Sequence, residues 1–134
     1  MAEKFLKKII AQNQEDLRII SALCSEAIIK QSEIKFLKEN KIFLISLERK
    51  NKEKINSNET INSILKFGFI EKSRSKNIDQ NNETNILKLL AIDLFKMKKN
   101  YEIVLLFSNN GIITLEAEVI EIELDNVEKI NDKN

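Results

Sequence analysis

EDLRIISALCSEAIIKQSEI, residues Glu15–Ile34, contains the one segment of the chain that we assign to an amphipathic helix. Asn13 is a favourable N-cap, and Glu15 and Asp16 place negative charge in the first turn, where the helix dipole favours it. Apolar residues then recur three and four positions apart, which is the spacing of one buried stripe. These residues are Leu17, Ile20, Leu23, Cys24, Ala27 and Ile28. We therefore expect a helix that packs this stripe against the remainder of the protein, with Cys24 at its centre.

Cys24 is the only cysteine of the chain, which has no histidine. A reactive cysteine usually needs a basic partner, most often histidine, and the middle of a helix gains little from the helix dipole. We interpret Cys24 as a small buried hydrophobic residue. The lack of histidine also argues against a Ser-His-Asp triad and against most zinc sites.

The composition is that of a globular protein, because 43% of the 134 residues are hydrophobic and 32% are charged. This length fits a single domain, residues 1–134. A net charge of +1 favours neither a nucleic-acid binder nor a membrane-surface protein. No apolar run approaches the roughly 20 residues of a membrane-spanning helix, and the N-terminus lacks a signal-peptide pattern. With one cysteine and no internal disulfide, we expect a cytoplasmic protein.

The segments on either side of the predicted helix read as strands. A short strand, Lys4–Ala11, precedes it, and two strands, Ile34–Phe36 and Ile42–Leu47, follow it around the polar break Lys38–Lys41. We expect this break to form a hairpin turn with Asn40 in the left-handed conformation.

The middle of the chain contains two extended segments. Leu65, Phe67 and Phe69 alternate as a strand, in which Gly68 marks a bulge or a close backbone approach. Glu71–Ile78 continues as a second extended piece.

Ile86–Phe95 is apolar on both faces, so its periodicity fits either a central strand or a helix. The next pair is clearer, since Tyr101–Phe107 and Ile113–Ala117 alternate on either side of Asn110-Gly111, which predicts a type I′ turn.

The apolar phase slips by one residue after Ala117, which leaves residues 119–130 open to two interpretations. A strand tolerates such a slip only by bulging. A terminal helix competes, because Ile120, Leu124 and Val127 also fit helical spacing. We favour the bulged strand for its β-branched residues.

Together these segments predict an α+β fold: a single N-terminal helix packed on a mostly antiparallel, meander-like curved sheet or half-barrel of about seven to eight strands. Two polar segments, residues 50–62 and 79–85, read as mobile loops.

Two rows of charged residues are candidate sites. In the first, Lys72, Arg74 and Lys76 project to one face of an extended segment, with Ser73 and Ser75 opposite. This basic row fits a phosphate, an acidic peptide or a nucleic-acid backbone. The second, an acidic ladder, fits a Mg²⁺ or Ca²⁺ site; its members are Glu116, Glu118, Glu121, Glu123 and Asp125. Cross-strand pairing of the two rows in a solvated face explains both patterns without a ligand.

Four blocks carry a resemblance to a known family: EDLRIISALCSEAIIKQSEIKFLKENKIFLISLERK, SILKFGFIEKSRSKNI, ILKLLAIDLF and YEIVLLFSNNGIITLEAEVIEIELDNV. In this order they resemble short bacterial cytoplasmic proteins, mainly alphaproteobacterial, grouped as domain-of-unknown-function family 2948. The most specific parts are Glu15–Leu17 and the block from Phe107 to Leu124. The resemblance implies a strand at Leu87–Phe95. The chain differs in having SNNG where the family hairpin is glycine-rich, and in lacking the family's frequent tryptophan after the third strand. The family has no assigned activity, so it supplies no functional residues.

We therefore expect a non-enzymatic binding or interaction module without a cofactor. A protein partner or self-association through an exposed sheet edge is the expected kind of interaction, and neither a membrane nor a nucleic acid is expected. Two alternatives stay open: an anion or nucleic-acid binder that uses Lys72, Arg74 and Lys76, and a carboxylate-dependent, metal-assisted enzyme built on the acidic ladder.

Overall fold

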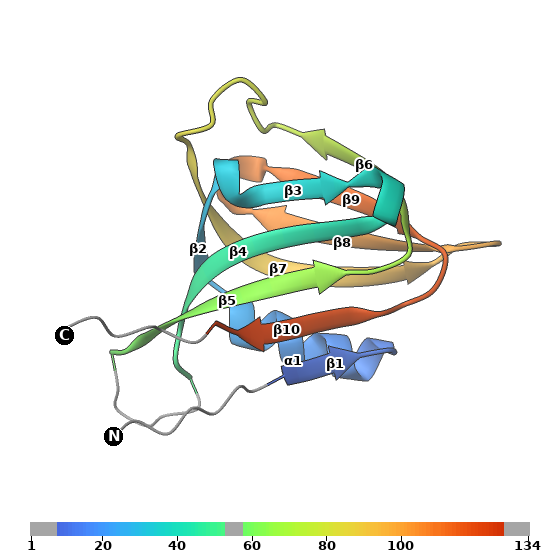
Figure 1. The fold of residues 1–134 in the computed structure, drawn as a ribbon, viewed down its shortest axis with the longest axis horizontal. Helices are drawn as coiled ribbons and strands as arrows, with labels where there is room; N and C mark the ends of the chain where they lie inside the picture. The colour runs from blue at the N-terminus through green and yellow to red at the C-terminus, as the bar shows by residue number, and fades with distance from the viewer. Residues whose placement is uncertain (1–7, 53–57, 128–134) are drawn as a thin grey trace.

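The computed structural model describes residues 8–52 and 58–127, which contain one α-helix and ten β-strands (Figure 1). In chain order these elements are β1 (Lys8–Ala11), α1 (Gln14–Cys24), β2 (Ala27–Lys30), β3 (Ile34–Leu37), β4 (Ile42–Lys50), β5 (Thr60–Phe67), β6 (Ile70–Lys76), β7 (Ile86–Lys96), β8 (Tyr101–Phe107), β9 (Ile112–Ala117) and β10 (Ile122–Asn126). Three short 3-10 turns are η1 (Gln31–Glu33), η2 (Lys38–Asn40) and η3 (Ser108–Asn110). Within the described ranges, no helix has both the length and the apolar character needed to cross a membrane.

All ten strands belong to one antiparallel sheet that curls around its core without closing. The strand order is β1-β10-β5-β4-β2-β7-β8-β9-β6, and β3 pairs with β4 beside β2. The α+β class and the curved antiparallel sheet are thus as the sequence predicts. The order is a meander only in part, because β1, β2, β6 and β10 pair with strands that are distant in the sequence.

Two bends, at residues 68–69 and 118–121, fold the sheet over itself. The Gly68 N–H donates to the Glu121 carbonyl at 2.9 Å, and the Glu118 N–H donates to the Phe69 carbonyl at 2.9 Å. The pairing of β6 with β9 therefore leads directly into the pairing of β5 with β10. The close backbone approach expected at Gly68 is confirmed. The strand expected to include Phe69 ends at Phe67, because Phe69 adopts a left-handed conformation (φ 58°) and turns its ring to solvent.

The ten strands exceed the seven to eight of the prediction for two reasons. The first is β2, which contains Ala27 and Ile28, two residues that the sequence placed on the helix. The second is the phase slip after Ala117. The chain stops pairing as β9 at Ala117 and resumes at Ile122 as β10 in another part of the sheet. Residues 119–126 are therefore neither a helix nor one continuous bulged strand, and residues 128–130 of that prediction lie outside the described part.

The helix begins as predicted and ends earlier. The Asn13 side-chain oxygen accepts a hydrogen bond from the Asp16 N–H at 2.8 Å, and Leu17, Ile20 and Cys24 are buried. The helix stops at Cys24 because Glu26 takes a left-handed conformation (φ 70°) and donates its N–H to the Leu89 carbonyl. Pairing of the next residues with β4 and β7 overrides the helical spacing.

The predicted turns form, each with a different left-handed residue. In the turn after β3 this residue is Lys41 (φ 59°), not Asn40. In the β8–β9 hairpin, Asn109 and Asn110 have φ of 61° and 63°, whereas Gly111 has φ −73°. The turn is therefore centred one residue earlier than Asn110-Gly111.

The two predicted loops have different outcomes. Residues 79–85 lie between β6 and β7, as predicted. The loop at 50–62 is shorter than predicted, because β4 includes Lys50 and β5 already begins at Thr60.

Ile86–Lys96 forms the central strand β7, so the segment that fitted either a strand or a helix is a strand. Residues 1–7 lie outside the described part, so of the predicted strand Lys4–Ala11 only Lys8–Ala11 is observed.

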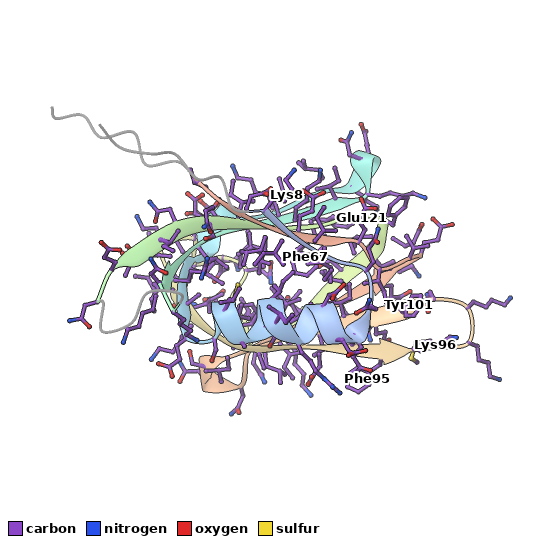
Figure 2. The ribbon with its side chains drawn as sticks, turned by 90° about the horizontal axis from the view of Figure 1, so that it is seen from below. Lys8, Phe67, Phe95, Lys96, Tyr101 and Glu121 are labelled. Carbon is purple, nitrogen blue, oxygen red and sulfur yellow. The ribbon has the colours of Figure 1, made fainter. Side chains whose placement is uncertain are left out.

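One hydrophobic cluster fills the inside of the curled sheet. Alternate residues of the strands point inward, as in β4, where Phe43, Ile45 and Leu47 are buried. The helix covers the opening between the edge strand β1 and the strand β7 (Figure 2). Behind it the ring of Phe67 lies fully buried in the core.

Candidate binding groove

A groove lies where the outer edges of β3 and β6 face each other, and its cavity volume is about 410 Å³. In the described part of the chain, β3 pairs with β4 alone and β6 pairs with β9 alone, so each strand has one unpaired edge. The arrows of the two strands run in opposite directions (Figure 1).

The floor of the groove is apolar and continuous with the core. Its side chains are Ile34, Phe36, Phe43, Ile78 and Ile113. The rings of Phe36 and Phe43 have centroids 6.0 Å apart, and those of Phe43 and Phe67 are 6.1 Å apart. Phe36 is half-buried, whereas Phe43 and Phe67 are buried. The aromatic contacts therefore run from the surface of the groove into the interior.

The first end of the groove is closed where η2 meets the start of β6. The Ile70 N–H donates to the Lys41 carbonyl at 2.9 Å, and the Lys41 ammonium lies 2.9 Å from a Glu71 carboxylate oxygen. The hydrogen bond from the Lys41 ammonium to Glu71, together with the charge of the Glu71 carboxylate, raises the pKa of Lys41. The two strands are therefore held together at this end and separate beyond it.

The second end is crossed by the segment between β6 and β7. The Gln31 side-chain amide donates to the Asp79 carbonyl at 2.5 Å and accepts from the Asn85 amide at 3.3 Å. Gln80 donates to the Ser75 hydroxyl at 2.6 Å. Polar side chains thus form the rim, above an apolar floor.

Of the basic row, Arg74 lines this groove, whereas Lys72 and Lys76 do not. Alternation along β6 turns Ser73 and Ser75 toward the groove and the charged ends of the basic row toward the outer face. The Arg74 guanidinium donates to Glu102 at 3.1 Å and to Glu116 at 3.2 Å. This geometry favours the alternative in which acidic residues of neighbouring strands neutralise Arg74, whereas Lys72 and Lys76 have no ion pair within the described ranges. Lys72 lies opposite Glu116 in the register.

The acidic ladder is divided by the bend at residues 118–121, so its members do not form one row. Glu116 lies on β9 and pairs with Arg74, whereas Glu123 lies on β10 with its carboxylate 3.6 Å from the Lys8 ammonium. Across residues 8–52 and 58–127, no three side chains of the Cys, Asp and Glu types are close enough to share a metal ion.

A family model described as a protein of unknown function (DUF2948) matches residues 7–133. The chain belongs to this family. The match includes both edges of the groove and all ten strands of this DUF2948 protein. No curated protein and no solved structure matches the chain.

Cys24 is fully buried in the core of this DUF2948 protein, which confirms its interpretation as a hydrophobic residue. Arg49, which lies between the predicted strand Ile42–Leu47 and the predicted loop 50–62 and received no role from the sequence, is also buried. Its Nε donates to the Ser63 hydroxyl at 3.1 Å, and its Nη2 donates to Asn126 at 3.0 Å. The signal was present, because Arg49 continues the inward-pointing series Phe43, Ile45 and Leu47.

A second hollow, of about 480 Å³, lies over β2, β4 and β5. Its lining includes Val127, the last residue before the undescribed segment 128–134.

Proposed function

We propose that this DUF2948 protein is a non-enzymatic binding module that takes its ligand into the groove between β3 and β6. The observation that carries the proposal is a hollow of about 410 Å³ over partly buried apolar side chains, between two unpaired strand edges. Apolar surface that is concave, bordered by polar groups and continuous with the core is the usual setting of a binding site. Cys24 is buried and forms no disulfide, which is compatible with a reducing compartment, and we propose the cytoplasm.

The residues that line the groove support a binding role more than a catalytic one. Its lining includes only two ionisable side chains, Arg74 and Glu83. Arg74 is held by two carboxylates on the outer face, which leaves Glu83 without a second ionisable group from the groove. Acid–base or nucleophilic catalysis usually needs at least two groups that converge on one reacting atom.

The two alternatives have weaker support. Anion binding by the basic row would draw on Arg74, two of whose five donors are already bonded to Glu102 and Glu116. A metal-assisted reaction on the acidic ladder requires neighbouring carboxylates, and the bend at 118–121 separates Glu116 from Glu123.

Filling the groove tests the proposal. We expect anilinonaphthalene sulfonate, an amphipathic dye that fluoresces in apolar sites, to bind the parent protein and to bind the Ser73→Trp variant weakly. The Ser73 side chain faces the groove, so an indole there occupies the space above the floor. Lys88→Trp is the matched control, because Lys88 is exposed on β7 and does not line the groove. Equal dye binding by the parent and a folded Ser73→Trp protein would contradict the proposed site.

A further inference from the structure

We propose that the ligand of this groove is an extended segment of a protein partner in which apolar and acidic residues alternate, and that the segment pairs with β6 as an added antiparallel strand. This inference rests on the proposed function, since it names the occupant of the same groove. It is argued from three features: the unpaired backbone, the alternation of side chains at the two edges, and an arrangement that the protein already contains.

The backbone of β6 provides the pairing surface. β6 is the last strand of the order, and seven residues, Ile70–Lys76, form its edge. In a strand, alternate N–H and C=O groups point to each side, so about half of those in β6 point away from β9. In the described part of the chain, the bond from the Ile70 N–H to the Lys41 carbonyl is the only backbone hydrogen bond between β6 and the segment around β3. An exposed edge of this kind is the surface that peptides use when they bind by strand addition.

The inward side of the groove selects apolar side chains. At their inward positions, β4, β5, β8 and β9 carry mainly large hydrophobic residues, whereas β6 carries Ser73 and Ser75. Beside these small side chains the ring of Phe36 is partly exposed, and the buried side chain of Ile113 lines the groove. A strand added to β6 places every second side chain over this floor. Apolar residues at those positions remove the exposed apolar surface from water.

The outward side of the groove selects acidic side chains. Lys72 and Lys76 point outward from β6, and Lys35 points outward from β3. In residues 8–52 and 58–127, none of these three ammonium groups has a carboxylate within ion-pair distance, whereas Arg74 between them is paired. The outward side chains of an added strand lie between these lysines, where opposite charges stabilise cross-strand pairs. An alternating apolar and acidic segment therefore satisfies both faces.

Strand β10 already shows this arrangement inside the same sheet. Its residues Ile122 and Leu124 are buried, and Glu123 and Asp125 alternate with them on the outer side. β10 lies between β1 and β5, where Glu123 is opposite Lys66 in the register and 3.6 Å from the Lys8 ammonium. A lysine-bearing strand thus flanks the acidic strand on each side. The groove repeats these flanks, with Lys35 on β3 and Lys72 and Lys76 on β6, and lacks the strand between them.

The relative direction of the two edges decides which one pairs. β3 runs toward Lys41, and β6 starts beside Lys41 and runs away from it, so the two strands are antiparallel to each other. A strand between them is antiparallel to one and parallel to the other. We assign the antiparallel pairing to β6, because its edge is longer and antiparallel ladders are slightly more stable for each residue.

The probe for the test is a fluorescent peptide with the sequence IEIELDN, taken from residues 120–126 of the chain, and its control is IKIKLKN. Fluorescence anisotropy measures the binding of each peptide to the full-length protein. We expect the parent to bind the acidic peptide at least about tenfold more tightly than the basic one. The charge-reversed variant Lys35→Glu/Lys76→Glu reverses this preference. Lys88→Glu/Lys96→Glu, which makes the same change of net charge on the exposed side of β7, keeps the preference of the parent.

Ser73→Trp provides a second measurement, since it blocks the floor without changing charge. We expect it to reduce binding of the acidic peptide at least about tenfold. If Ser73→Trp and Lys35→Glu/Lys76→Glu both bind the acidic peptide as tightly as the parent does, the peptide binds elsewhere, for example in the place of β10. This result overturns the inference. So does the absence of peptide binding by a parent protein whose groove binds the dye, a result that leaves the proposed function intact. Failure of both the dye and the peptide to respond to Ser73→Trp contradicts both proposals.

Discussion

The curled sheet has two sides on which its strands separate, and the protein treats them differently. On the first side, α1 covers the opening between β1 and β7 with Leu17, Ile20 and Cys24. The Ser21 hydroxyl also accepts a hydrogen bond at 3.0 Å from the Ile92 N–H, on the edge of β7 beyond its pairing with β2. On the second side, between β3 and β6, residues 8–52 and 58–127 provide no comparable cover for the apolar floor or the strand edges.

This difference shows what the second side lacks. A helix supplies apolar side chains to the floor and polar atoms to the free backbone groups, and these are the two things that an exposed sheet edge needs. The groove has a floor and an edge and receives neither from the described part of its own chain. The binding role that we propose for it therefore corresponds to a missing element of structure, which in our proposal a partner provides.

Truncation of the aromatic rings that join the groove to the core gives the largest expected difference. Phe67→Ala removes a fully buried ring and is expected to lower the free energy of unfolding by about 3–5 kcal/mol. Phe36→Ala is expected to cost only about 1–2 kcal/mol, because its ring on the groove floor is already partly exposed. Urea unfolding followed by circular dichroism measures both values. Equal losses for the two variants would show that the groove is as well packed as the core.

Truncation on the helix tests the covered side. Ile20→Ala is expected to lower the free energy of unfolding by about 3 kcal/mol, because Ile20 is fully buried on the inner face of α1. Its neighbour Ile19 is 55% exposed, so Ile19→Ala serves as the matched control and should change stability by less than about 0.5 kcal/mol. If the two substitutions have the same effect, α1 is not packed on the sheet as described.

Removal of one hydroxyl tests how far the helix stabilises the edge of β7. Ser21→Ala leaves the Ile92 N–H without its acceptor and is expected to lower the free energy of unfolding by about 1 kcal/mol. Ser21→Thr retains the hydroxyl and should preserve the stability and the slow amide exchange of Ile92. Unchanged exchange at Ile92 in the alanine variant would argue against a role of Ser21 in this edge.

A substitution in the groove has the smallest expected effect and the opposite sign. Ser73→Val adds an apolar, β-branched side chain over the exposed floor, and we expect it to raise the free energy of unfolding by about 0.5–1 kcal/mol. A binding site retains such a destabilising residue when the space that it leaves is used by the ligand. A loss of stability would show that the floor has no room for the added methyl groups.

The local patterns of the sequence predicted much of the fold. The N-cap at Asn13, the buried stripe from Leu17 to Cys24 and the alternation of β8 and β9 each depend on residues close in the chain, and all three are present. Errors occurred where a distant partner decided the conformation. Ala27 and Ile28 continue the helical spacing and nevertheless form a strand, since β4 and β7 accept their backbone. The end of β9 at Ala117 likewise reflects pairing with strands far away in the sequence.

The groove was harder to predict than the fold. The sequence predicts that Ser73 and Ser75 lie opposite the basic row, but it does not show which of these two faces is turned inward. Which face of β6 looks into the molecule depends on its register with β9, which no local pattern gives. Arg49 is the opposite case. The alternation of β4 predicts that Arg49 points inward, whereas its charge suggests an exposed position.

The pairing of β1 with β10 has a consequence for biosynthesis. In Figure 1 these strands, from the two ends of the chain, lie side by side, and β10 also pairs with β5. β10 follows β1 and β5 in the chain, so these two strands keep an open edge until β10 has been synthesised. These edges can pair with other strands until β10 emerges, and the lysines that face Glu123 keep them charged during this time.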